Sequence, residues 1–337
     1  MGRKQQAQGA VSDGADRSGL QTVPLNFVRR PAVTFDGKEV CLFVTYVPRD
    51  QLLPGAVALI AAMVASGQTV VVCCAVNDPG LTLDLAGLEG ATAIVTRRNG
   101  GYDFALWAAA LEGMPELWSA KRLFFVNDSI LGPLNGFART LDRIRTSPAD
   151  YLALTDSYEF RHHSQSYFFV LQNKAMDSPE VRRFWHEVRV EKTKTAVIRK
   201  YEVEFLNYLQ TVAGLATEIL FAFDRIFPGV DWSLIRAGNP THQLWEHLLR
   251  SGFPFVKAEL LFANPTKVNL AYWKPLVALH GGDVGLFQRH LAKLRETRGR
   301  PAKGIRRATW VFLCWVIGDA RIMELSALWF HSRRRLK

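Results

Sequence analysis

Short, continuous apolar runs rich in β-branched residues alternate with helical patterns through the first half of the chain. Strands are predicted at residues 40–46, 70–76, 91–96 and 122–126, with helices over 54–66 and 102–112. Continuous apolar strands are typical of a sheet that is buried on both faces. Strands that alternate with helices indicate βαβ units and parallel pairing. The sequence therefore predicts an α/β fold with a mostly parallel central sheet, to which residues 151–155 and 167–171 add two strands.

The pattern becomes mostly helical after residue 178. Helices are predicted over residues 178–190, 198–213, 240–251 and 305–332. The polar start of the chain predicts a disordered leader over residues 1–36. We therefore expect one three-layer α/β/α domain over residues 37–285, followed by a basic amphipathic helical tail over residues 286–337.

The net charge of +11 is concentrated at the C-terminal end. Residues 295–337 hold eleven Lys and Arg against three Asp and Glu, which gives +8 and leaves +3 for residues 1–294. The body lacks the basic stripe with aromatic residues that is typical of nucleic-acid binding, so no nucleic acid is expected as a partner. In the tail, Trp310 and Trp315 lie among apolar residues between arginine clusters. This pattern favours a helix on an anionic membrane surface, although a helix packed on the domain is the alternative.

No apolar run is long enough to cross a bilayer. The longest, residues 56–65, has ten residues, whereas a spanning helix needs about twenty. Residues 1–22 lack the pattern of a signal peptide, and the four cysteines lie in apolar runs without CxxC spacing. We expect a cytoplasmic protein that binds peripherally to the inner face of the cell membrane.

Polar and acidic residues follow the predicted strands. Asp78 follows the second strand, residues 97–103 follow the third, and residues 127–129 follow the fourth. In an open α/β sheet, ligands bind beyond the carboxyl ends of the strands. Carboxylates, amides and arginines at that edge suit a nucleotide diphosphate and a divalent cation. A plain turn is the alternative at residues 77–80, whereas Asp128 follows four large apolar residues, where an unpartnered charge is costly.

The nucleotide-binding and nucleophile motifs of several large enzyme classes are absent. The sequence has no GxGxxG opening its first helix, no GxxxxGK[ST] and no GxSxG. These absences argue against a dinucleotide-dependent oxidoreductase, a P-loop kinase and an α/β-hydrolase.

Five blocks of sequence, in the same order, resemble the rhamnan synthesis protein F family. They are RNGGYDFALW at residues 98–107, FVNDSILGP at 125–133, HSQSYF at 163–168, VIRKYE at 197–202, and NPTHQLW at 239–245 together with PFVK at 254–257. Any one block alone would be weak, but together they cover roughly residues 38–270. The resemblance implies a glycosyltransferase of rhamnose-containing bacterial cell-wall and lipopolysaccharide polymers.

The resemblance also implies a GT-A-like fold, in which a Rossmann-like sheet binds a nucleotide-sugar donor. The implied donor is dTDP-L-rhamnose, and the implied acceptor is a lipid-linked glycan. The residues expected to bind the donor are Asp78, Arg98, Asn99, Gly101, Asp103, Asn127 and Ser129.

GT-A-like enzymes hold a divalent cation with an Asp-x-Asp motif after the fourth strand, where this chain has NDS at residues 127–129. Asp128 is therefore expected to be catalytic and to bind Mg²⁺ or Mn²⁺. Only one carboxylate is present, so water and phosphate would complete the metal shell, or Arg97 or Arg98 would neutralise the diphosphate instead. For Asp103 the alternative to donor binding is a helix N-cap.

An inverting transfer needs a base that deprotonates the acceptor hydroxyl. Glu202 best resembles the acidic residue that begins a helix after the acceptor strand in related enzymes, and Glu204 and Asp156 follow as candidates. The alternative for Glu202 is a favourable position near a helix start without a catalytic role.

Two adjacent histidines precede the strand at residues 167–171. Side chains of neighbouring residues in an extended segment face opposite ways, so His162 and His163 are unsuited to bind one metal together. We expect His163, with Asp156, Gln165 and Tyr201, to contact the acceptor or the diphosphate.

Two other functions remain open on the sequence. The missing second carboxylate of an Asp-x-Asp pair would suit a catalytically inactive scaffold in a polysaccharide-assembly complex. An enzyme that transfers another group, such as phosphate, is the third alternative.

Overall fold

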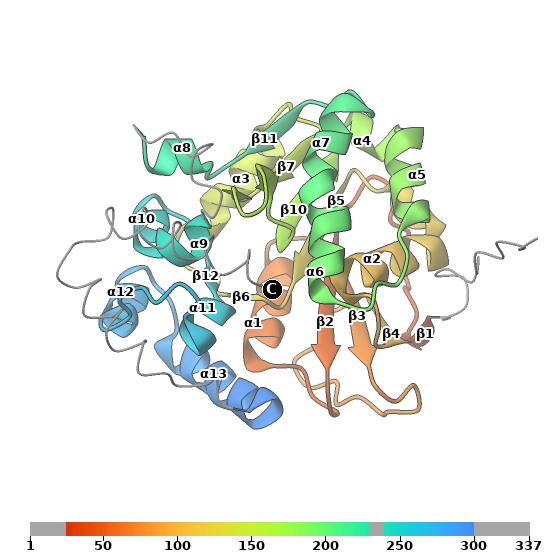
Figure 1. The fold of residues 1–337 in the computed structure, drawn as a ribbon. Helices are drawn as coiled ribbons and strands as arrows, with labels where there is room; N and C mark the ends of the chain where they lie inside the picture. The colour runs from red at the N-terminus through yellow and green to blue at the C-terminus, as the bar shows by residue number, and fades with distance from the viewer. Residues whose placement is uncertain (1–24, 229–238, 300–337) are drawn as a thin grey trace, which may run out of the picture.

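The computed structural model describes residues 25–228 and 239–299 and is built around an eight-stranded sheet (Figure 1). The strand order is β1 (Asn26–Arg29), β4 (Ala93–Arg98), β3 (Thr69–Val76), β2 (Glu39–Val47), β5 (Arg122–Asn127), β10 (Phe168–Gln172), β7 (Tyr151–Ala153) and β11 (Thr217–Ile219). Strands β4, β3, β2 and β5 are parallel to one another, and so are β7 and β11. Strands β1 and β10 run antiparallel to their neighbours. The mostly parallel sheet confirms the predicted α/β fold class.

Helices cover both faces of the sheet, as predicted for a three-layer domain. Along β2, Val40, Leu42 and Val44 face one hydrophobic cluster, and Cys41 and Phe43 face another. The first cluster is completed by α2 (Tyr102–Gly113), α5 (Pro179–Glu187) and α7 (Val203–Thr211). The second is completed by α1 (Pro54–Ala65) and α3 (Phe137–Thr146). This alternation is the pleat of a strand that is buried on both faces.

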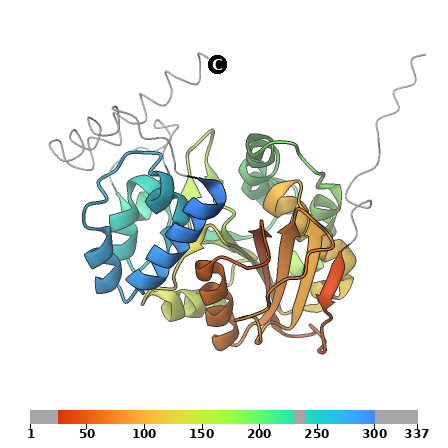
Figure 2. The same ribbon diagram turned by 90° about the horizontal axis from the view of Figure 1, so that it is seen from below.

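A helical group packs beside the sheet, next to α1 (Figure 2). It consists of α10 (Trp245–Arg250), α11 (Ala258–Ala263), α12 (Trp273–Leu279) and α13 (Val284–Arg298). Its link to the sheet is the ribbon of β6 (Ile130–Leu131) and β12 (Val256–Lys257), which pair antiparallel. On the other side, the buried His290 of α13 accepts a hydrogen bond from the Gly55 amide of α1 at 3.1 Å. The group therefore has its own hydrophobic cluster and is attached to the main domain at two places.

Shorter elements connect these layers. They are the helices α4 (Lys174–Asp177), α6 (Lys194–Val197), α8 (Phe223–Ile226) and α9 (Pro240–Gln243), the 3-10 helix at Pro115–Ser119, the π-helical turn at Ile198–Glu202, and the pair β8 (Asp156–Ser157) and β9 (His163–Ser164). The predicted helix over 198–213 is thus a π-helical turn followed by α7. The predicted helix over 240–251 is divided into α9 and α10.

Two predicted boundaries are wrong where the structure describes them. The end of the supposed leader forms β1, and Phe35 is only 1% exposed, so residues 26–36 belong to the domain. The predicted start of the tail falls inside α13, where Phe287 and Leu291 are buried. Residues 1–24 and the predicted helix over 305–332 lie outside the described residues. Among the helices that are described, none has the length and apolarity to span a bilayer.

Candidate active site

A cavity of about 370 Å³ lies at the carboxyl end of β5. Its walls come from the start of α2, the segment after β5, the β8–β9 hairpin, the π-helical turn, α9 and β12. The predicted site residues that line it are Asp103, Asn127, Ser129, His163, Gln165 and Glu202. The position agrees with the rule that α/β sheets bind ligands beyond the carboxyl ends of their strands.

One wall of the cavity is a chain of hydrogen bonds that starts at Asp103. The Asn127 amide donates to Asp103 Oδ2 at 2.8 Å, and Asn127 Oδ1 accepts from the Ser129 backbone N–H at 3.1 Å and also from its hydroxyl. Lys257 Nζ donates to Ser129 Oγ at 2.8 Å. Each polar side chain of this wall is thereby held in one orientation, which is a requirement for a preorganised binding site.

Two carboxyl groups near this wall have raised pKa values. Burial raises the pKa of Asp103 to about 6, and the nearby charge of Asp128 adds to the shift. Burial also raises the pKa of Asp128, although its carboxylate accepts a hydrogen bond from Thr45 Oγ1 at 2.6 Å. Asp128 itself is not among the lining residues, whereas its neighbours Asn127 and Ser129 are. The two carboxylates are therefore close enough to interact, but only Asp103 lines the cavity.

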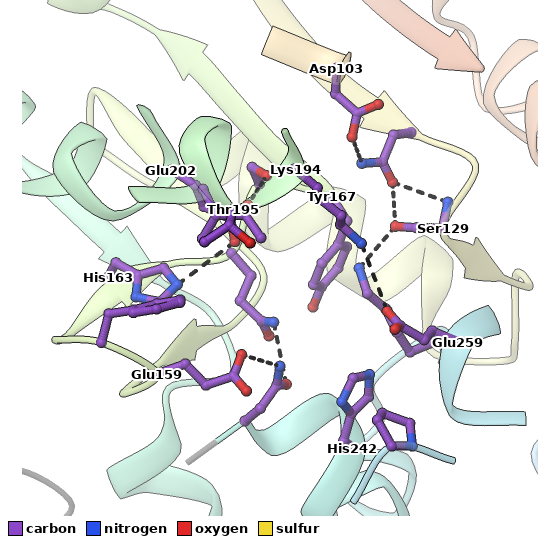
Figure 3. A pocket seen from close by; sticks show the side chains of 18 of the residues that line it. Asp103, Ser129, Glu159, His163, Tyr167, Lys194, Thr195, Glu202, His242 and Glu259 are labelled. Atoms are coloured by element: carbon purple, nitrogen blue, oxygen red, sulfur yellow. Dashed lines mark hydrogen bonds and ion pairs between the residues drawn. The ribbon is translucent and has the colours of Figure 1, made fainter. Parts of the chain in front are cut away.

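The opposite wall carries Glu202 and His163 (Figure 3). The Ser166 hydroxyl donates to Glu202 Oε2 at 2.7 Å, and His163 Nε2 lies 3.7 Å from Glu202 Oε1. His163 Nδ1 is 2.8 Å from the Arg161 carbonyl oxygen, which can only accept. This contact keeps a proton on Nδ1 and leaves Nε2 to face the carboxylate.

The pKa values of Glu202 and His163 depend on each other. Burial raises the pKa of Glu202, but the His163 imidazolium and the Ser166 hydroxyl outweigh it and hold the pKa below its usual value. For His163, burial lowers the pKa, but Glu202 outweighs this and raises it above its usual value. Glu202 is therefore an ionised carboxylate at neutral pH in spite of its burial.

Side-chain amides also line the cavity between its two walls. Gln165 Oε1 accepts from Thr155 Oγ1 at 2.7 Å, and its amide donates to Asn239 Oδ1 at 3.3 Å. His242 also lines the cavity, and burial lowers its pKa to about 4, so it is neutral at physiological pH. The Asn239 amide also donates to the Glu159 carboxylate at 3.3 Å, and a wall of amides and a carboxylate of this kind suits a polyhydroxylated ligand.

Three predicted donor-binding residues lie outside the cavity, on the exposed end of β3 and β4. Asp78 accepts a hydrogen bond from the Gly80 amide at 2.9 Å, which is the turn role that the sequence left open. Arg98 is exposed, and Asn99 donates to Asn77 Oδ1 at 3.3 Å. Arg97, the other candidate for the diphosphate, is buried and donates to the Gly100 carbonyl at 3.1 Å.

Three more predicted residues have structural contacts instead. Gly101 is buried with φ 75°, and a Cβ there would lie 2.5 Å from Ala105 Cβ, so the chain itself occupies the space expected for a donor. Asp156 accepts from the Phe223 amide at 2.8 Å and contacts His162. Tyr201 is buried among aromatic residues and accepts from the Arg189 amide at 2.8 Å. None of the three lines the cavity.

The two adjacent histidines separate as predicted from their alternation along the chain. His163 is buried and lines the cavity, whereas the side chain of His162 is 47% exposed. Glu204, a rival base, forms an ion pair with Arg161 outside the cavity.

Lys257, Asn239 and His242 also line the cavity, although the sequence had not indicated them as site residues. All three lie in the last resembling block, at residues 239–257, and this was the available signal. Lys257 reaches the cavity through the pairing of β12 with β6, a long-range contact that no local pattern indicates.

The donor set offers little for a divalent cation. Within the described parts of the chain, no group of three His, Cys, Asp or Glu side chains is arranged to hold a metal ion. The binding of Mg²⁺ or Mn²⁺ by Asp128 therefore stays a prediction.

The fold and cavity define an α/β protein with a polar ligand site at the carboxyl ends of its parallel strands. The chain belongs to the rhamnan synthesis protein F family, whose sequence pattern it matches over residues 81–295. This match confirms the resemblance carried by the five blocks. A relative is virulence protein VirA of Vibrio anguillarum, which is 27% identical over 242 residues, covering 63% of this chain and 78% of VirA.

Two solved structures align with this chain at low similarity. The inositol-1-phosphate CTP transferase from T. maritima aligns with a TM-score of 0.32 and 11% identity, over 57% of this chain and 88% of that one. The galactosyltransferase LgtC aligns with a TM-score of 0.26 and 8% identity, over 48% of this chain and 64% of that one.

Proposed function

We propose that this chain is a glycosyltransferase that moves a sugar from a nucleotide-activated donor onto a growing polysaccharide. The position of Glu202 supports this most directly, because it faces the wall of Asp103, Asn127 and Ser129 across one cavity. Membership of a family named for rhamnan synthesis supports a polysaccharide as the product.

In this proposal Glu202 is the general base. As an ionised carboxylate, it accepts the proton of an acceptor hydroxyl. The hydroxyl oxygen attacks the anomeric carbon of the donor, the bond from that carbon to the diphosphate breaks, and the nucleoside diphosphate leaves with the electron pair. Attack on the face opposite the leaving group inverts the anomeric configuration.

The proposed donor is dTDP-L-rhamnose, and the proposed acceptor is a lipid-linked glycan. An acceptor anchored in a membrane would require the enzyme to work at its surface. The basic residues 295–337 are suited to anionic lipid, because each basic residue near such a surface contributes about 1 kcal/mol.

An assay of the purified chain against a panel of nucleotide sugars, with free nucleotide as the readout, tests this proposal. Nucleotide release from dTDP-L-rhamnose in the presence of a glycan acceptor is the expected result. Release from another nucleotide sugar would keep the enzyme class and replace the donor. If no donor and acceptor pair gives turnover, the chain is not a glycosyltransferase, and the alternative of an inactive scaffold in polysaccharide assembly is favoured.

A further inference from the structure

We propose that Lys257 supplies the positive charge that binds the donor diphosphate, in the place where a divalent cation was predicted. This inference rests on the proposed function and assigns a role to a residue that the sequence left without one. It predicts that donor binding does not require a metal ion.

The geometry places Lys257 at the donor wall. Lys257 pairs with Ile130 of β6, and β6 follows the end of β5 in the chain. Its ammonium donates to Ser129 Oγ at 2.8 Å and lies 4.1 Å from the centroid of the Tyr167 ring. In the described part of the chain, Ser129 is its one hydrogen-bond acceptor, so two of its three N–H groups remain to bind phosphate oxygens.

The nearby carboxylates do not form ion pairs with Lys257, so its positive charge remains available to bind an anion. Glu202, Glu259 and Asp103 attract its ammonium and Lys194 repels it, but none of these carboxylates forms an ion pair with it. Lys194 lies on the same cavity and faces Glu259 at 3.9 Å. Burial lowers the pKa of Lys257 to about 8, so a bound diphosphate would stabilise the charged form.

The same wall is poorly suited to a metal ion. Asp128, the predicted ligand, bonds Thr45 and does not line the cavity, and the amide of Asn127 occupies Asp103 Oδ2. A divalent cation beside Ser129 would also meet the ammonium of Lys257, which repels it. A lysine can take over the electrostatic task, because it binds phosphate as a point charge.

In the transfer step, Lys257 stabilises the leaving group. As the bond from the anomeric carbon to the diphosphate oxygen breaks, the diphosphate gains a negative charge, and the acceptor proton passes to Glu202. Positive charge that is already in place at the leaving oxygen lowers the barrier without reorganisation.

Calorimetric titration of the full chain with dTDP and with inorganic pyrophosphate, in excess EDTA and then in excess Mg²⁺, tests this inference. The wild type should bind both probes in EDTA. Lys257→Gln should weaken binding about 10–100-fold, as expected for loss of a charge-assisted hydrogen bond, and Lys257→Arg should retain most of it. Lys274→Gln, an exposed lysine on α12 outside the cavity, is the matched control and should bind as the wild type does.

A series of titrations at different pH values provides a second test, which uses only the wild type and Lys257→Arg and so keeps a long cationic side chain at this position. Pyrophosphate binding to the wild type should weaken above pH about 8, and in Lys257→Arg this weakening should disappear. Binding that EDTA abolishes and Mg²⁺ restores would overturn the inference while leaving the donor site in place. Unchanged binding by Lys257→Gln would also overturn it. If the wild type binds neither probe in either condition, the proposed donor site fails and the inference fails with it.

Discussion

Ser129 Oγ and Lys257 Nζ are 2.8 Å apart, although 128 positions separate the two residues in the sequence. The contact joins the end of the central strand β5 to the helical group through β12, and together they form the wall of the cavity that faces Glu202 and His163. The site therefore depends on a long-range pairing as well as on the βαβ half of the chain.

The pH dependence of activity should depend on His163. His163→Gln removes the cation that holds the pKa of Glu202 down, while burial still raises it. The acid limb of the kcat/KM profile should therefore move to higher pH. His162→Gln is the matched control, because the exposed neighbour faces Asp156 and should leave the limb in place. An unchanged acid limb in His163→Gln would show that Glu202 does not govern it.

Asp103 should reduce stability at neutral pH. Its pKa is about 6 in the folded protein against 3.8 for the free group, so its ionisation opposes folding as the pH rises through 6. Asp103→Asn should raise the free energy of unfolding at pH 7.5 by about 2 kcal/mol, after allowance for partial exposure, and the gain should vanish below pH 4. Urea denaturation at both pH values measures this. A gain of the same size at both would contradict the raised pKa.

Gly101 should be required for packing. Gly101→Ala forces a residue with a side chain into a positive φ and brings its Cβ to 2.5 Å from Ala105 Cβ. We expect a loss of unfolding free energy of about 2–3 kcal/mol, of which about 1 kcal/mol is conformational. Gly37→Ala is the control, because Gly37 has φ 66° but no atom near the added Cβ. Equal losses of unfolding free energy in both variants would show that close packing at Gly101 does not contribute to its requirement.

The first half of the fold could be predicted because its strands and helices are indicated by patterns within short stretches of the sequence. Each of the strands β2 to β5 contains an apolar run, and α1 and α2 begin where their sequence patterns indicate. In contrast, β1 and α13 were assigned to a leader and a tail. Their place in the domain depends on contacts with β4 and α1, which are distant in the sequence.

Only part of the site could be predicted, again because sequence patterns indicate local structure but not long-range contacts. Asp103, Asn127, His163 and Glu202 were found through strand ends and family blocks, and the cavity contains all four. Asp78 lies in a turn outside the cavity, and the sequence could not separate the two roles because Asp in a turn has the same pattern as Asp in a binding loop. Lys257 was missed because a single lysine on a short strand carries no local signal.

Membrane binding is predicted for the C-terminal segment, which lies outside the described residues. Deletion of residues 305–337 should release the protein from anionic liposomes in a sedimentation assay and spare activity on a soluble acceptor analogue. The domain should remain folded, because α13 ends at Arg298. Continued sedimentation, or unfolding of the shortened chain, would favour a helix packed on the domain.

The turnover of Glu202→Gln shows whether Glu202 acts as the base in sugar transfer. Removal of a positioned base costs on the order of 10²–10⁴ in rate, so kcat should fall by that factor while calorimetry shows unchanged binding of the nucleotide sugar. Glu204→Gln, two residues away and outside the cavity, should keep the kcat of the wild type. A Glu202→Gln variant that turns over at the wild-type rate, or that loses only donor affinity, would show that Glu202 is not the base.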